Sequence, residues 1–173
     1  MSRPILETDR LRLREIRMED LDDLLATWGN PEAMRLFPQT LDRDGMRAWI
    51  ERNLARYRDA GHGIWAVLRK SDGQFLGDCG LVLQDVDGVE ELEVGYHLDP
   101  RFWGQGYATE AARACLGYAR MTLGRTRNIS MIRPENLASR RVAERNGLRP
   151  ERELFWRGYT HVIHAIDVAD PAR

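Results

Sequence analysis

Apolar residues in the first sixty positions recur at two different spacings, which separates an initial strand from the helices that follow. Residues 10–14 alternate arginine and leucine, the period-two pattern of a half-buried strand. Over residues 18–28 the apolar positions recur every three or four residues, so a helix is expected there. Pro31 is expected to start a short second helix. A longer helix, capped by Thr40 or Asp42, is expected to continue to the next pair of glycines.

The next part of the chain alternates β-rich runs with turn residues. Runs at 64–69, 74–84 and 90–98 are separated by Ser71-Asp72-Gly73 and Asp87-Gly88, which indicates an antiparallel meander. The remaining elements are expected, in order, to be a helix over 108–123, a strand over 128–132, a helix over 136–146 closed by Gly147, and strands over 148–156 and 159–168. No linker or repeat interrupts this order, so we expect a single α+β domain over residues 1–173.

Charge and composition exclude several classes of protein. The 26 basic and 27 acidic residues leave a net charge of −1, so no partner is expected among nucleic acids or membrane surfaces. The charged first positions and the absence of a long apolar run predict a cytoplasmic protein. Cys79 and Cys115 lie in apolar patterns and are expected to be buried free thiols. His161 and His164 are three apart on an expected strand, so they are not expected to share a metal ion.

The junction between the third meander strand and the next helix carries the clearest chemistry. Two glycines, Gly104 and Gly106, let the backbone approach a ligand without interference from a Cβ atom. The following helix directs free N–H groups and its positive dipole end at the same loop. These features predict a site for an anion such as a pyrophosphate. A plain glycine-rich turn with a helix cap is the alternative.

Several stretches in this order resemble the GCN5-related N-acetyltransferase (GNAT) family, and within it the branch of the ribosomal-protein N-terminal acetyltransferases RimJ and RimL. The resemblance covers nearly the whole chain and implies a GNAT fold with a mixed, mostly antiparallel central sheet. The matching stretches are Thr8-Asp9-Arg10-Leu11-Arg12-Leu13-Arg14, Asn30-Pro31-Glu32-Ala33-Met34, Glu93-Val94-Gly95-Tyr96, the loop from Pro100 to Ala111 with its Arg101-x-x-Gly104-x-Gly106 spacing, and the segment from Pro134 to Leu148.

The resemblance implies that acetyl-CoA is the co-substrate. Its pyrophosphate would be held by main-chain N–H groups of the loop, with charge from Arg101 and a hydroxyl from Thr109, while Trp103 and Tyr107 either touch the cofactor or pack beneath the loop. The loop residues implied are Arg101, Trp103, Gly104, Gln105, Gly106, Tyr107, Ala108 and Thr109. The strand before the loop would splay from its neighbour and offer the backbone of Tyr96, His97 and Leu98 to the pantetheine arm.

Proton transfer needs a base and an acid, because an amine must lose a proton during attack and the leaving thiolate gains from a donor. Glu93 stands at the family position often assigned as the base, directly or through water. His97 is a second candidate, since Glu93, Gly95 and His97 share one strand face. Asn136 and Ser139 are one helical turn apart, and the resemblance implies that Asn136 contacts pantetheine and Ser139 lies near the sulfur. Asn136 also fits an ordinary N-cap, and Glu93 also fits a solvated strand carboxylate.

The acceptor pocket of this fold is built from the early helices and the final hairpin, which makes Arg35, Phe37, Gln39 and Tyr159 candidates. We therefore expect transfer of an acetyl group to a primary amine by direct attack. The acceptor is a protein N-terminal α-amine, as in RimJ and RimL, or a small molecule, and a homodimer is one oligomeric state open to it. A non-catalytic acyl-CoA-binding module is the alternative. A Rossmann-type domain is disfavoured by the three hairpin-linked strands.

Overall fold

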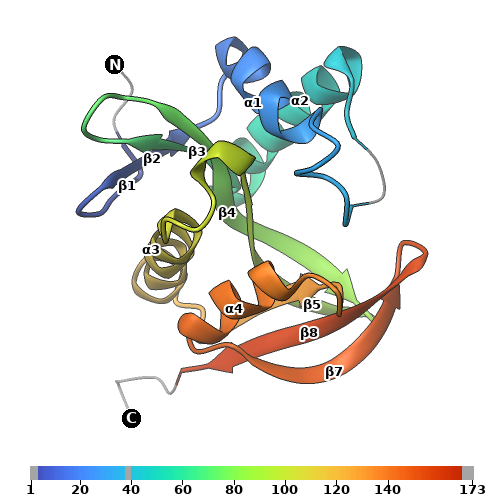
Figure 1. Cartoon of the computed structure of the whole chain (residues 1–173). Coiled ribbons are helices and arrows are strands. Elements are labelled where there is room, and N and C mark those ends of the chain that lie inside the picture. The colour runs from blue at the N-terminus through green and yellow to red at the C-terminus, as the bar shows by residue number, and fades with distance from the viewer. Residues whose placement is uncertain (1–3, 38–39, 169–173) are drawn as a thin grey trace.

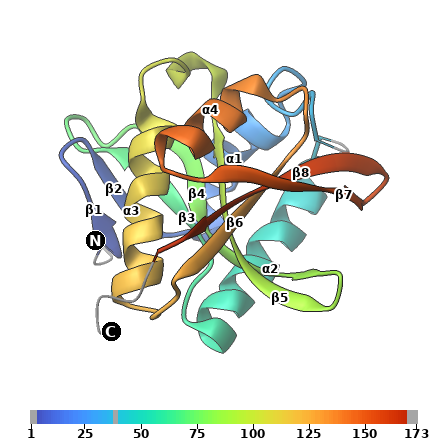
Figure 2. The same cartoon turned by 90° about the horizontal axis from the view of Figure 1, so that it is seen from below.

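One twisted sheet of eight strands forms the centre of the molecule. The computed structural model describes residues 4–37 and 40–168, and its strands lie in the order β1-β2-β3-β4-β5-β6-β8-β7 (Figures 1 and 2). All neighbouring strands are antiparallel except β5 and β6, which are parallel. The strands are β1 Leu6–Glu7, β2 Leu11–Glu15, β3 Ile64–Arg69, β4 Phe75–Val86, β5 Val89–Leu98, β6 Arg127–Ile132, β7 Arg149–Trp156 and β8 Tyr159–Asp167. The sheet is thus mixed and mostly antiparallel, as expected.

Within residues 4–37 and 40–168, four α-helices cover the two faces of this sheet (Figures 1 and 2). They are α1 Leu21–Trp28, α2 Arg43–Ala60, α3 Tyr107–Met121 and α4 Leu137–Arg145. Successive residues of β3 point to opposite faces, so Trp65 and Val67 pack under α3, whereas Ile64 and Ala66 pack under α1 and α2. None of these helices, within the described part of the chain, is long and apolar enough to cross a membrane.

One local expectation is wrong, one short strand was not expected, and one of two alternative caps is found. The short helix expected from Pro31 is a series of turns, in which Met34 N donates to Asn30 O at 3.0 Å and Phe37 N donates to Met34 O at 2.9 Å. Isolated turns of this kind do not propagate, because helix nucleation is costly. The two-residue strand β1, paired as Leu6 with Leu13, is too short to leave a sequence pattern. Asp42 rather than Thr40 caps α2, accepting from Gly45 N at 2.8 Å.

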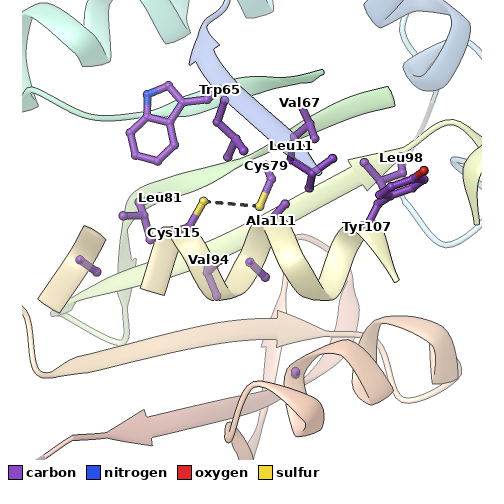
Figure 3. Close-up of a cluster of buried hydrophobic side chains, with 14 of the residues drawn as sticks. Leu11, Trp65, Val67, Cys79, Leu81, Val94, Leu98, Tyr107, Ala111 and Cys115 are labelled. Carbon is purple, nitrogen blue, oxygen red and sulfur yellow. Dashed lines mark hydrogen bonds between the residues drawn. The ribbon is translucent and has the colours of Figure 1, made fainter. Parts of the chain in front are cut away.

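The core beneath α3 fixes the position of that helix against the sheet (Figure 3). Small side chains on its inner face, among them Ala111 and Cys115, are fully buried and let the helix approach the strands closely. The sulfur atoms of Cys115 and Cys79 lie 3.6 Å apart, and both residues are buried free thiols, as predicted. Because α3 is held this firmly, its first turn has a defined place at the end of β5.

The sheet opens between β5 and β6. Strands β4 and β5 pair over ten residues, from Gly77 with Leu98 to Val86 with Val89, whereas β5 and β6 share one registered pair, Glu93 with Ile129. Beyond Glu93, β5 therefore diverges from β6 and has an edge without a strand partner. This agrees with the splayed strand that the sequence led us to expect.

Candidate active site

The loop between β5 and α3 has the backbone geometry of an anion site. Gly104 and Gly106 adopt φ angles of 73° and 82°, a left-handed region that glycine enters without steric cost. Gly106 is the N-cap of α3 and offers no side chain to cap it. The N–H groups of the first turn are consequently left for an external acceptor, next to the positive end of the helix dipole.

Two of the loop residues named from the sequence turn away from this site. Arg101 is paired with Asp99, with Nη2 2.7 Å from Oδ2, and its side chain is 68% exposed. This arginine lowers the pKa of the Asp99 carboxyl through its hydrogen bonds. The carbonyl of Gln105 accepts from Arg10 Nη1 at 3.1 Å, and its side chain is exposed. Arg10, which sequence reasoning missed, thus ties the β1–β2 turn to the loop.

The two aromatic residues of the loop both border the cleft but differ in burial. Tyr107 is 7% exposed and packs into the core beneath α3, with the Arg10 guanidinium 4.6 Å from its ring centre. Trp103 is 41% exposed, and its indole N–H donates to the Leu98 carbonyl at 2.8 Å. That bond ties the loop to the end of β5.

A cleft of about 340 Å³ runs from this loop along the open edge of β5. The residues predicted from the sequence that border it are Arg35, Phe37, Tyr96, His97, Leu98, Trp103, Gly104, Gly106, Tyr107, Ala108, Thr109, Asn136 and Ser139. Residues not predicted that also border it include Thr27, Glu32, Arg141 and Arg145. The cleft thus gathers main-chain and side-chain groups from β5, α3, α4 and the segment 27–37.

Four predicted residues lie away from the cleft, and a fifth falls outside the described residues. Glu93, Arg101, Gln105 and Tyr159 are not among the residues that border the cleft. The Tyr159 ring lies under the Arg133 guanidinium, 4.3 Å away, and Arg133 in turn donates to the Leu36 carbonyl at 3.5 Å. Gln39 falls outside the described residues.

Helix α4 brings Asn136 and Ser139 to the cleft, and Asn136 also serves as its N-cap. The Asn136 side-chain oxygen accepts from Ser139 N at 3.2 Å. The Ser139 carbonyl accepts from the Tyr96 hydroxyl at 2.8 Å, which joins α4 to β5. Burial raises the pKa of Tyr96 well above its usual range. The bonds with Asn136 and Tyr96 both involve backbone atoms of Ser139, and the residue borders the cleft.

Glu93 lies at the point where β5 leaves β6. Its Oε2 accepts from Gln84 Nε2 at 2.8 Å and its Oε1 accepts from Met131 N at 3.1 Å. Burial raises the pKa of this carboxyl, although both hydrogen bonds act in the opposite direction. The residue is therefore a half-buried strand carboxylate with two hydrogen-bond partners rather than a fully solvated one.

His97 lies on the same face of β5 as Glu93 and borders the cleft. Its side chain is held by contacts that the sequence did not predict. Its Nδ1 lies 3.0 Å from Oδ1 of Asp78, and Oδ2 of Asp78 accepts from the Trp28 indole N–H at 2.6 Å. Asp78 is fully buried. An aspartate inside the apolar strand Phe75–Val86 was the signal available in the sequence.

Comparisons with known proteins agree with this architecture. A family model described as an acetyltransferase (GNAT) domain matches residues 10–149. The chain is 37% identical over 150 residues to the uncharacterized protein YkkB of Bacillus subtilis, covering 86% of this chain and 87% of YkkB.

Solved structures share the fold over almost the whole length. An acetyltransferase from Agrobacterium tumefaciens superposes with a TM-score of 0.80 at 27% identity, covering 95% of each chain. RimL, the ribosomal L7/L12 α-N-protein acetyltransferase, solved in complex with coenzyme A, superposes with a TM-score of 0.78 at 20% identity, covering 96% of this chain and 98% of that chain. Fold, cleft and family match together place the chain in the GNAT acetyltransferase family.

Proposed function

We propose that the protein transfers an acetyl group from acetyl-CoA to a primary amine by direct attack on the thioester. The observation that carries this proposal is the cleft along the open edge of β5, with an uncapped helix N-terminus at one end. The pyrophosphate would accept from main-chain N–H groups of residues 104–108 and from the Thr109 hydroxyl, since the Trp103 N–H already donates to the Pro100 carbonyl at 3.2 Å. The amides of pantetheine would pair with the free backbone edge of residues 96–98.

The two substrates would reach this edge from opposite faces of the sheet. Val94 and Leu98 belong to the core under α3, whereas His97 stacks on Trp28 of α1. Acetyl-CoA would therefore lie on the side of α3 and α4, and the amine would enter from the 27–37 segment, where Arg35 and Phe37 border the cleft. The reacting atoms would meet at the strand edge.

In this reaction the protein needs only to position the two substrates and to transfer protons. The Ser139 hydroxyl would donate to the leaving thiolate, and the proton of the amine would go to one of the two base candidates on this strand face, Glu93 through water or His97. A protein N-terminal α-amine is the acceptor we propose first, on the resemblance to RimJ and RimL, and a small-molecule amine is the other class. The alternative is a module that binds acyl-CoA without turnover, which the absence of Glu93 from the cleft favours.

A pair of matched glycine variants tests the cofactor site. Gly104 and Gly73 both have φ of 73°, and a Cβ on either would meet nothing within 4 Å. The backbone strain of an alanine is therefore similar at both positions, on the order of 1 kcal/mol, but only Gly104 borders the cleft. We expect Gly104→Ala to weaken coenzyme A binding by about tenfold, which corresponds to 1.4 kcal/mol, while Gly73→Ala leaves it unchanged.

Calorimetry measures the affinity of each variant for coenzyme A, and a thiol-release assay with a panel of amines measures turnover. Equal affinities for the two variants would contradict the placement of the pyrophosphate. Binding of acetyl-CoA without release of coenzyme A above background for any peptide or small amine would support the non-catalytic module.

A further inference from the structure

His97 has one ring nitrogen engaged and one left for the cleft. Nδ1 faces the Asp78 carboxylate at 3.0 Å, and the side chain, 16% exposed, borders the cleft. A carboxylate only accepts hydrogen bonds, so the neutral imidazole must carry its proton on Nδ1. Nε2 then holds a lone pair, and no other described residue donates a hydrogen bond to it.

The orientation of this ring is fixed from three sides. The Trp28 ring lies 4.2 Å from the His97 ring and the Phe37 ring lies 4.7 Å from it, both tilted. Trp28 also donates to the second oxygen of Asp78, so that carboxylate cannot rotate without losing a hydrogen bond at 2.6 Å. Contacts of this kind hold a side chain in one rotamer and one tautomer before any substrate arrives.

We propose that His97 is the general base of the acetyl transfer, and that Asp78, itself held by Trp28, is its positioning residue. The proposal rests on the proposed function. The structure favours His97 over Glu93 as the base. Both carboxylate oxygens of Glu93 already accept hydrogen bonds, from Gln84 and Met131, and Glu93 does not border the cleft, whereas His97 does.

The transfer step balances with these groups alone. The lone pair of the neutral amine attacks the carbonyl carbon of the thioester, a C–N bond forms, and the C–S bond breaks with its electron pair leaving on sulfur. The proton lost by the new amide nitrogen goes to Nε2 of His97. The thiolate takes up one proton, from the Ser139 hydroxyl or solvent, and the imidazolium returns its proton to restore both groups. The products are the N-acetylated amine and coenzyme A thiol.

Asp78→Asn gives a tautomer test that does not depend on turnover. The Trp28 indole can only donate, so the amide oxygen of an asparagine at this position would face Trp28 and its NH₂ group would face His97. His97 would then have to accept on Nδ1 and carry its proton on Nε2. We expect ¹⁵N NMR of the imidazole to show an unprotonated Nε2 in the wild type and a protonated Nε2 in Asp78→Asn. A protonated Nε2 in the neutral ring of the wild type would overturn the role of Asp78.

Kinetics test the base itself. We expect His97→Gln to lower kcat by about 100-fold and Asp78→Asn to lower it by at least about tenfold, each with coenzyme A affinity within about twofold of the wild type. Asp85→Asn, an exposed position on the same strand as Asp78, and His161→Gln on β8 are the matched controls and should retain wild-type turnover. Circular dichroism and melting curves verify that the variants are folded.

The two proposals fail in different ways. If the wild type binds coenzyme A but acetylates no amine, the proposed function fails and the base assignment fails with it. If the wild type is active and folded His97→Gln keeps half of its kcat or more, only the base assignment is overturned.

Discussion

Replacing Thr27 by valine should stabilise the free protein and weaken the binding of its acceptor. Thr27 lies in the last turn of α1, is 1% exposed and borders the cleft beside Trp28. Its hydroxyl is buried and has no hydrogen-bond partner in the part of the chain that the structure describes. Valine has nearly the same shape but no hydroxyl, so the substitution removes only the unpaired group.

The magnitude follows from the cost of leaving a buried polar group unpaired, about 1–3 kcal/mol. Taking the lower end, Thr27→Val should raise the free energy of unfolding by about 1 kcal/mol, which for a domain of this size raises Tm by about 2–4 °C. If the hydroxyl bonds the acceptor, the variant loses a bond worth about 1 kcal/mol, or about fivefold in KM for the amine.

Two measurements separate these effects. Denaturant unfolding gives the stability of the free protein, and KM for the amine at saturating acetyl-CoA gives the contribution to binding. Thr122→Val, at the exposed C-terminal end of α3, is the control and should change stability by less than about 0.5 kcal/mol. A destabilised Thr27→Val would mean that the hydroxyl is already satisfied, for example by an ordered water, and an unchanged KM would mean that it does not touch the acceptor.

Three further predictions concern the surroundings of the cleft. Arg10→Ala removes the bond to the Gln105 carbonyl at 3.1 Å and should weaken coenzyme A binding several-fold in calorimetry with kcat unchanged; an unchanged affinity would contradict a role in ordering the loop. Burial raises the pKa of Glu93 above 4.5, so its stabilising effect is complete below pH 4.5 and is lost as pH rises through the folded value. Between pH 4.5 and neutrality, the free energy of unfolding of Glu93→Gln should therefore fall less than that of the wild type. Parallel plots of unfolding free energy against pH for the two proteins would refute this. Burial raises the pKa of the Cys79 thiol, and neither it nor Cys115 should react with a thiol reagent until the protein unfolds; labelling of the folded protein would contradict their burial.

The fold could be predicted from the sequence where local patterns agree with tertiary packing. The three meander strands are joined by turns rich in Asp and Gly, and the glycines at 104 and 106 do occupy left-handed positions. The failure at Pro31 has the opposite cause. The residues that start a helix are present, and Met34 N does donate to the Asn30 carbonyl. The following residues form separate turns instead of continuing that hydrogen-bond series, so no helix propagates.

The sequence predicts individual site residues, but it does not predict which of them come together in the folded protein. Glu93 and His97 were assigned correctly to one strand face, but which of them borders the cleft depends on β6, whose pairing is not encoded near either residue. The link from His97 through Asp78 to Trp28 joins three elements far apart in the chain. An aspartate in an apolar strand indicates a buried partner without identifying it.

The opening between β5 and β6 affects how any substitution of Glu93 must be interpreted. Glu93 forms the single registered pair of the two strands and bonds the main chain of Met131, and the Ser130 hydroxyl donates to the Val94 carbonyl beside it. The residue therefore holds the strands together where they begin to diverge, and its loss would alter the edge on which pantetheine is expected to lie. A fall in turnover caused by that change must be accompanied by weaker coenzyme A binding, since both depend on the same edge. A fall in kcat at unchanged coenzyme A affinity would instead assign Glu93 to proton transfer, together with His97 or in its place.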